Sequence, residues 1–160
     1  MSRANWEALA FPITVHAGAC ASVMPTGWCD HVPLRETSQS RAGEFFRAAN
    51  GQKIHNHGER VISMMTREGA MRDMRFTVCD VSEALRSVSQ MCRAGHRVIF
   101  NAHWSPEGSY IQHVDTGECM WLEENNGLYM LNTKVAPTGR HRSGEHSNRI
   151  DKGFGWRANP

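Results

Sequence analysis

The amino-acid sequence predicts an all-β domain, mainly antiparallel, with one principal helix. Many of its apolar residues fall in short segments rich in Val, Ile, Phe and Thr, a pattern typical of strands. The stretches between these segments are rich in Gly, Asn, Asp and Pro, which favour turns. Only the stretch from Ser82 to Gly95 has the spacing of a helix.

In the first half of the chain we expect one strand followed by two hairpins. The turn His16–Ala19 follows the first strand, and Asn50-Gly51 is a dipeptide favoured in two-residue hairpin turns. The turn Arg67–Ala70 forms the tip of a longer hairpin. The expected strands are Phe11–Val15, Glu44–Ala49, Lys53–His57, Arg60–Thr66 and Met71–Val78.

In the second half we expect the helix and then four short strands. Ser82 can cap the start of the helix, and Gly95 can end it in a left-handed conformation. The apolar face of the helix consists of Leu85, Val88, Met91 and Cys92. The four strands are expected at Arg97–Asn101, Ser109–His113, Glu118–Leu122 and Leu128–Leu131.

Length and composition predict a single globular domain. The chain has 160 residues, of which 40% are hydrophobic and 21% charged, ordinary values for a globular protein. We expect an N-terminal extension (1–10), the domain (11–135) and a flexible basic tail (136–160). No apolar run approaches the ~18 residues of a membrane-spanning helix, so we expect no membrane partner.

The charge distribution argues against a dedicated nucleic-acid-binding protein. The net charge is +2, and the whole excess of positive charge lies in the tail rather than on a concentrated basic face. Nucleic acid is therefore expected to bind at most weakly, through the tail. The basic residues of the tail are Arg140, Arg142, Arg149, Lys152 and Arg157.

The cysteines indicate an intracellular protein with reduced thiols. Their number is odd, they are scattered, and no Cys-x-x-Cys pair occurs. We expect most of them to be buried as small hydrophobic residues. The five cysteines are Cys20, Cys29, Cys79, Cys92 and Cys119.

Several motifs occur in an order that indicates a protein family. The segments, in chain order, are His16-Ala17-Gly18-Ala19, Ser22-Val23-Met24-Pro25, Leu85-Arg86-Ser87-Val88-Ser89-Gln90-Met91 and Gly95-His96-Arg97-Val98-Ile99-Phe100. This order resembles the retropepsin-type aspartic protease segment of Ty1/copia-like retroelement polyproteins, with the start of the region that precedes integrase. That family has apolar-Asp-Ser-Gly-Ala first and Leu-Leu-Ser-Val-Ser-Gln-Leu later. The resemblance covers Phe11 to Val135 and implies a closed, retropepsin-like β barrel.

The resemblance also implies a function and partners. A retropepsin is a homodimeric endopeptidase that binds an extended peptide or polyprotein segment, and it needs no cofactor. Each subunit contributes one Asp, and the two carboxylates share a proton while they activate a water. A hairpin flap covers the peptide, and the turn Arg67, Glu68, Gly69 and Ala70 is the expected flap here.

The catalytic loop of this chain departs from the family at two positions. His16 occupies the Asp position and Ala17 the Ser position, whereas Gly18 and Ala19 match. Two imidazolium charges ~4 Å apart in a dimer would repel by about 4 kcal/mol at an effective dielectric near 20. Such a pair has no carboxylates between which to share a proton, and Ala17 cannot orient it, so we expect peptidase activity to be absent or very weak. Asp115-Thr116-Gly117 spells the family motif, but its setting predicts an exposed hairpin turn.

The sequence alone leaves three other hypotheses about the function open. The chain could be a peptide-binding module that does not cleave, because extended peptides bind sheet edges through main-chain hydrogen bonds. It could bind a metal, because His55 and His57 alternate on one strand and point the same way; candidate further ligands are His16, Cys20, Cys29 and His31. Least favoured is a Cys/His nucleophile formed by His16 and Cys20, which has no evident orienting acid.

Overall fold

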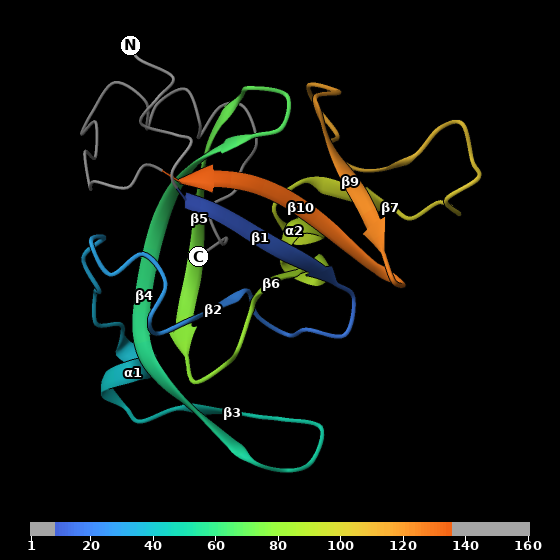
Figure 1. Ribbon diagram of the computed structural model, residues 1–160. Coiled ribbons are helices and arrows are strands. Elements are labelled where there is room, and N and C mark those ends of the chain that lie inside the picture. The colour runs from blue at the N-terminus through green and yellow to red at the C-terminus, as the bar shows by residue number, and fades with distance from the viewer. Residues whose placement is uncertain (1–8, 136–160) are drawn as a thin grey trace.

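The computed structural model describes residues 9–135 as a β-rich domain (Figure 1). Its strands are β1 (Leu9–His16), β2 (Val23–Pro25), β3 (Phe45–Arg47), β4 (Lys53–Thr66), β5 (Met71–Cys79), β6 (Ala84–Ser87), β7 (His96–Ile99), β8 (Ser109–His113), β9 (Cys119–Asn125) and β10 (Leu128–Val135). The helices are α1 (Ser38–Arg41) and α2 (Val88–Arg93). The predicted mostly-β character is confirmed.

The strands form one mixed sheet that closes on itself. Their order is β3-β4-β5-β2-β6-β1-β10-β9-β8-β7, and a further pairing of β4 with β10 makes a ring of the strands from β4 to β10. Two pairs, β1 with β6 and β2 with β5, are parallel, and the other pairs are antiparallel. Figure 1 shows the long β4–β5 pair on one side and the β7–β9 strands on the other.

The core lies inside this ring. Buried and partly exposed residues alternate along β4 from Asn56 to Thr66, because successive side chains of a strand point to opposite faces. Ile62 and Met64 of β4, like most residues that face the core, are large and apolar, and burying such a side chain is worth about 1.5–3 kcal/mol. The fully buried side chains include Phe11, Ile13, Ile62, Met64, Met74, Phe76, Met91 and Leu131.

Seven of the nine predicted strands occur as single strands, most with shifted ends, and the other two merge. The expected segments Lys53–His57 and Arg60–Thr66 form one strand, β4, with an irregular register between Asn56 and Gly58. Gly58 has φ +127°, and a β-carbon there would overlap the Arg35 carbonyl oxygen. The glycine therefore lets the strand continue past this crossing, where the sequence suggested a break.

The helix predicted between Ser82 and Gly95 is confirmed only in its second half, where it ends before Gly95 with φ +90° as expected. Residues 84–87 form β6, and α2 begins only at Val88 with Ser87 as its N-cap. β6 is paired on both sides, with β1 and with β2, and these backbone hydrogen bonds outweigh the helical spacing of Leu85 and Val88. The short elements β2 and α1 were not predicted, because neither is long enough to show a period.

Two smaller predictions have clear outcomes. Asp115-Thr116-Gly117 is the exposed turn between β8 and β9, as predicted, with the Gly117 N–H donating to the His113 carbonyl at 2.8 Å. The prediction that most cysteines are buried was wrong: only Cys79 is buried, and Cys20 and Cys92 are exposed. Residues 1–8 of the predicted N-terminal extension and the whole predicted tail (136–160) lie outside the residues that the structure describes. No helix of residues 9–135 is long and apolar enough to span a membrane.

His96, on β7, makes the stability of the domain depend on pH. Its side chain is buried, and burial, together with the neighbouring His113, lowers the pKa of His96 from 6.5 to about 4. In the unfolded chain His96 takes up its proton near pH 6.5, whereas the folded protein resists protonation down to about pH 4. The unfolded state is therefore favoured as the pH falls.

We predict that the free energy of unfolding falls by about 3 kcal/mol between pH 7 and pH 4 on account of His96. His96→Gln should remove this part of the decrease, as measured by urea denaturation across that range. His103→Gln, in an exposed loop, is the matched control and should keep the wild-type profile. A profile for His96→Gln that parallels the wild type would contradict this assignment.

Candidate functional site

The loop after β1 crosses the end of β6, and this crossing defines the candidate site. β6 lies between β1 and β2, with His16 opposite Ser87 and Val23 opposite Leu85. The chain therefore leaves β1, passes over the end of β6 and continues as β2 on its other side. Residues 17–22 are thereby brought next to the first turn of α2, although about 65 residues separate the two segments in the chain.

Ser87 ties this loop to the sheet. The Ser87 hydroxyl donates to the Ala19 carbonyl at 2.7 Å, and the Ser87 N–H donates to the Ser22 hydroxyl at 3.0 Å. The same Ser87 hydroxyl accepts from the Gln90 N–H at 3.3 Å and thereby caps α2. Ser22 and Ser87 are both buried, so these polar groups depend on one another rather than on water.

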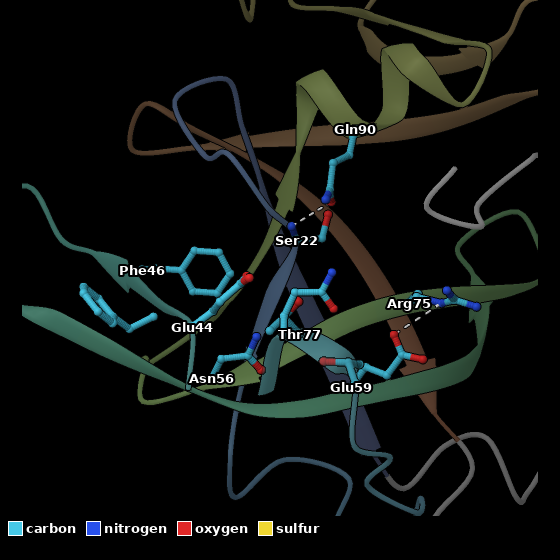
Figure 2. Close-up of a pocket in the computed structure, with 11 residues that line it drawn as sticks. Ser22, Glu44, Phe46, Asn56, Glu59, Arg75, Thr77 and Gln90 are labelled. Atoms are coloured by element: carbon cyan, nitrogen blue, oxygen red, sulfur yellow. Dashed lines mark hydrogen bonds and ion pairs between the residues drawn. The ribbon is translucent and has the colours of Figure 1, made fainter. Parts of the chain in front are cut away.

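Gln90 holds the far end of the loop. Its side-chain Oε1 accepts from the Ser22 N–H at 2.8 Å, a contact shown in Figure 2, while the Ser22 carbonyl accepts from the Thr77 N–H at 2.9 Å. The segment Ser87-Val88-Ser89-Gln90 therefore fixes the conformation of the loop. The sequence analysis identified this segment as a motif, but nothing in the neighbouring sequence predicted that it contacts Ser22.

His16 lies at the exposed end of β1 and is not paired with an acid. Its ring folds over the loop, so that a β-carbon at Gly18 would lie 2.8 Å from the imidazole Cε1. Among residues 9–135 no carboxylate forms an ion pair with His16. Nothing in the described part of the chain supplies the acid that the loop lacks.

The other aspartates of the domain serve elsewhere. Asp30 pairs with Arg60 at 3.6 Å, and Asp73 accepts a hydrogen bond from the Ser63 hydroxyl. Asp80 contacts His57, with 2.8 Å between Oδ1 and Nε2. None of them lies in the loop after β1, so none provides a carboxylate beside His16.

A pocket of about 320 Å³ adjoins the loop (Figure 2). Ser22 and Gln90, which hold the loop, form part of its wall, and Phe46 contributes an aromatic surface. The wall is otherwise mainly polar, and its remaining residues are Thr37, Gln39, Glu44, Phe45, Asn56, Glu59, Arg75 and Thr77. In this chain His16 to Ala19 lie next to the pocket wall without lining it.

The β3–β4 hairpin forms one side of the pocket, and β5 contributes to another. Phe45 and Phe46 of β3 line the pocket from that side, and Figure 1 shows this hairpin extending below β2. The turn Arg67–Ala70, predicted to be a flap, lies against β9 instead. There the Arg67 Nη1 meets the Glu123 Oε1 at 2.6 Å, and the Glu68 carboxylate accepts from the Trp121 N–H at 2.9 Å.

A buried arginine, Arg60, holds the segment between β2 and α1. Its guanidinium donates to the carbonyl oxygens of Val32 at 3.0 Å, Thr26 at 3.2 Å and Trp28 at 3.3 Å. The backbones of Arg35 and Glu59 also bond to each other, at 2.8 and 2.9 Å. These contacts fix the chain that leads to α1 and the Thr37 wall of the pocket.

Arg86 occupies the sequence position at which the family that the chain resembles has a leucine. It is buried, and burial lowers the pKa of Arg86 to about 9, which leaves the guanidinium charged at neutral pH. It donates to the Arg75 carbonyl at 3.0 Å and lies 5.8 Å from the centre of the Phe76 ring. The structure thus accommodates the substitution through contacts that a leucine could not make.

The geometry of the described residues gives little support to the hypotheses of a metal site and of a Cys/His nucleophile. The rings of His55 and His57 lie 4.7 Å apart, as their alternation predicted. However, residues 9–135 contain no group of three or more metal-ligating His, Cys, Asp or Glu side chains. Cys20 is exposed, and no orienting acid pairs with His16.

Comparison of the chain with protein-family models, with curated proteins and with solved structures finds no significant match.

We predict that Ser87→Ala lowers the free energy of unfolding by about 1–3 kcal/mol, because it leaves the partly buried Ala19 carbonyl and Gln90 N–H without their partner. Ser89→Ala is the matched control. Ser89 is only partly buried and bonds to the Ser87 hydroxyl at 3.0 Å, so its loss should cost less than about 0.5 kcal/mol. Equal effects in a urea titration would show that Ser87 has no special role.

Proposed function

We propose that residues 11–135 form a retropepsin-like domain of a retrotransposon-type polyprotein that binds extended peptides but has a disabled peptidase centre. The observation that carries the proposal is the contact between two distant motifs. The degenerate loop His16-Ala17-Gly18-Ala19 and the segment Ser87–Gln90, which carry the family resemblance, are joined by the hydrogen bonds of Ser87. The adjoining pocket is the binding site.

The loss of cleavage follows from the chemistry of the loop. Peptide hydrolysis by this class needs one carboxylate to take a proton from water and a second, protonated one to polarise the scissile carbonyl. An imidazole at His16 supplies neither group in the required pair, and Ala17 has no hydroxyl to orient it. The expected consequence is a loss of several orders of magnitude in rate.

Peptide binding needs none of these groups. The pocket wall offers hydroxyl and amide side chains, and β3 is an edge strand of the sheet. Both features favour an extended ligand that bonds through its main chain. Both hairpins contribute to the pocket wall, but the tip of the β4–β5 hairpin, residues 67–70, is not among the residues that line it, whereas Phe45 and Phe46 of β3 are. We therefore propose the β3–β4 hairpin, in place of residues 67–70, as the flap.

A second copy of this chain is the proposed partner, because one loop per chain makes half of a retropepsin centre. Sedimentation velocity should therefore show a dimer whose fraction rises with concentration. A strict monomer at high concentration would remove the shared cleft from the proposal and leave only the pocket of the single chain.

We predict that the unmodified protein shows no pepstatin-sensitive cleavage of a peptide library at about pH 5.5, whereas His16→Asp/Ala17→Ser gains such cleavage. The double substitution restores both the acid and the orienting hydroxyl of the loop. Mass spectrometry of the peptides gives the readout. Circular dichroism of each sample must show a folded protein, because protonation of His96 destabilises the domain at low pH.

The control is Ala17→Ser alone, which lacks the acid and should stay inactive. Robust pepstatin-sensitive turnover by the unmodified chain would contradict the proposed loss of activity.

A further inference from the structure

Two amide side chains in the pocket wall have one end fixed by the protein and the other end available. The Asn56 Oδ1 accepts from the Gly58 N–H at 2.9 Å, and the Gln90 Oε1 accepts from the Ser22 N–H at 2.8 Å. These bonds set the orientation of both amides, so each NH2 group is turned away from its backbone partner. Both residues line the pocket.

The Asn56 amide is the stronger indication of a ligand. Asn56 is only 6% exposed, and the hydrogen bond of its side chain is made by Oδ1. Its Nδ2 is not among the fully buried, unpaired atoms of the described residues, so this donor stays accessible from the pocket that Asn56 lines. Figure 2 shows the amide nitrogen of Asn56 directed into the pocket. A donor in this position is satisfied when an acceptor enters the pocket.

The charges around the pocket favour an uncharged ligand. The Glu59 carboxylate has a cation on each side, Arg75 at 3.7 Å and Arg35 at 3.8 Å. Glu44 is exposed, and on the same hairpin Lys53 and Arg47 lie 4.5 and 5.3 Å from the centre of the Phe45 ring. Because both signs are present around the pocket, a charged side chain would gain little there, whereas a neutral acceptor meets two donors.

We infer that the Asn56 Nδ2 and Gln90 Nε2 groups bind carbonyl oxygens of an extended, uncharged peptide segment that lies along Phe46. This inference rests on the proposed function and names the residues and the chemistry of the binding. Carbonyl oxygens recur along every peptide, so the two donors read the backbone rather than a particular side chain. The volume of the pocket lies at the small end of the range for ligand sites, which suits a short segment.

The inference is tested with substitutions that keep the structural half of each amide. Gln90→Glu and Asn56→Asp retain the oxygen that accepts from Ser22 or Gly58 but replace the donor with a second oxygen. Binding is measured by fluorescence polarisation at pH 7.5 with end-blocked, labelled octapeptides made of Ala, Val, Thr, Leu and Gln. Asn125→Asp, at an exposed site at the end of β9, controls for the added negative charge.

We expect each pocket substitution to weaken binding of these neutral peptides about tenfold, which is the usual effect of losing one hydrogen bond to a buried site. The control should bind like the wild type. Peptides in which one carbonyl at a time is reduced to CH2 provide a second test, which needs no protein variant. The peptide that lacks the critical carbonyl should bind about tenfold more weakly to the wild type and should no longer respond to Gln90→Glu.

The possible results separate this inference from the function on which it rests. If the folded wild type binds no peptide, the proposed peptide-binding function fails and the inference fails with it. If peptides bind but neither substitution nor any reduced carbonyl changes the affinity, the function stands and the assignment of Asn56 and Gln90 is overturned. If Asn56→Asp does not fold, Gln90→Glu and the reduced peptides decide the question.

Discussion

The buried hydroxyl of Ser87 is the contact on which the candidate site depends. It joins the Ala19 carbonyl, in the loop after β1, to the Gln90 N–H, in the first turn of α2. Ser22 completes the link through its own hydroxyl and N–H. A buried hydrogen bond of this kind is worth only about 1 kcal/mol net, but leaving its groups unpaired costs more. The loop therefore keeps one conformation even though its exposed residues, His16 and Ala17, contribute little to it.

The residues that hold the conformation of the loop differ from those at the positions of the catalytic groups. The shape of the loop is held by Ser22, Ser87 and Gln90, none of which would carry out hydrolysis. In the proteases that the chain resembles, the catalytic groups occupy the positions of His16 and Ala17, and both of these residues are exposed here. A chain of this design can lose catalysis and keep its binding surface, and that is the basis of the function proposed here.

Much of the fold could be predicted from the sequence, because the strands of antiparallel hairpins have local signals. Ser109–His113 was predicted with its observed bounds, and the turn at Asp115-Thr116-Gly117 has the composition that such turns require. The helix could not be placed correctly, because residues 84–87 are held in β6 by pairing with β1 and β2, strands distant in the chain. The join between Lys53–His57 and Arg60–Thr66 was missed because Gly58 usually signals a break.

The candidate site was predicted only in part, for the same reason. His16 to Ala19 were identified by their place in a motif, and the later Ser-Val-Ser-Gln segment by its amino-acid sequence. Nothing in the sequence near either segment indicated that the two are in contact. Asn56 escaped notice altogether, because a lone asparagine in a strand carries no signal until its burial and its bond to Gly58 are known. The turn Arg67–Ala70, predicted as a flap, is not among the residues that line the pocket, whereas Phe45 and Phe46 of β3 are; no local signal distinguished the two hairpin tips.

The most direct test of this account is an experimental structure of the protein with a neutral octapeptide bound. The account predicts an uncleaved, extended peptide between the β3–β4 hairpin and the start of α2, with its carbonyl oxygens within hydrogen-bond distance of the Asn56 and Gln90 amides. A peptide bound on another surface, or a cleaved peptide in the pocket, would contradict it.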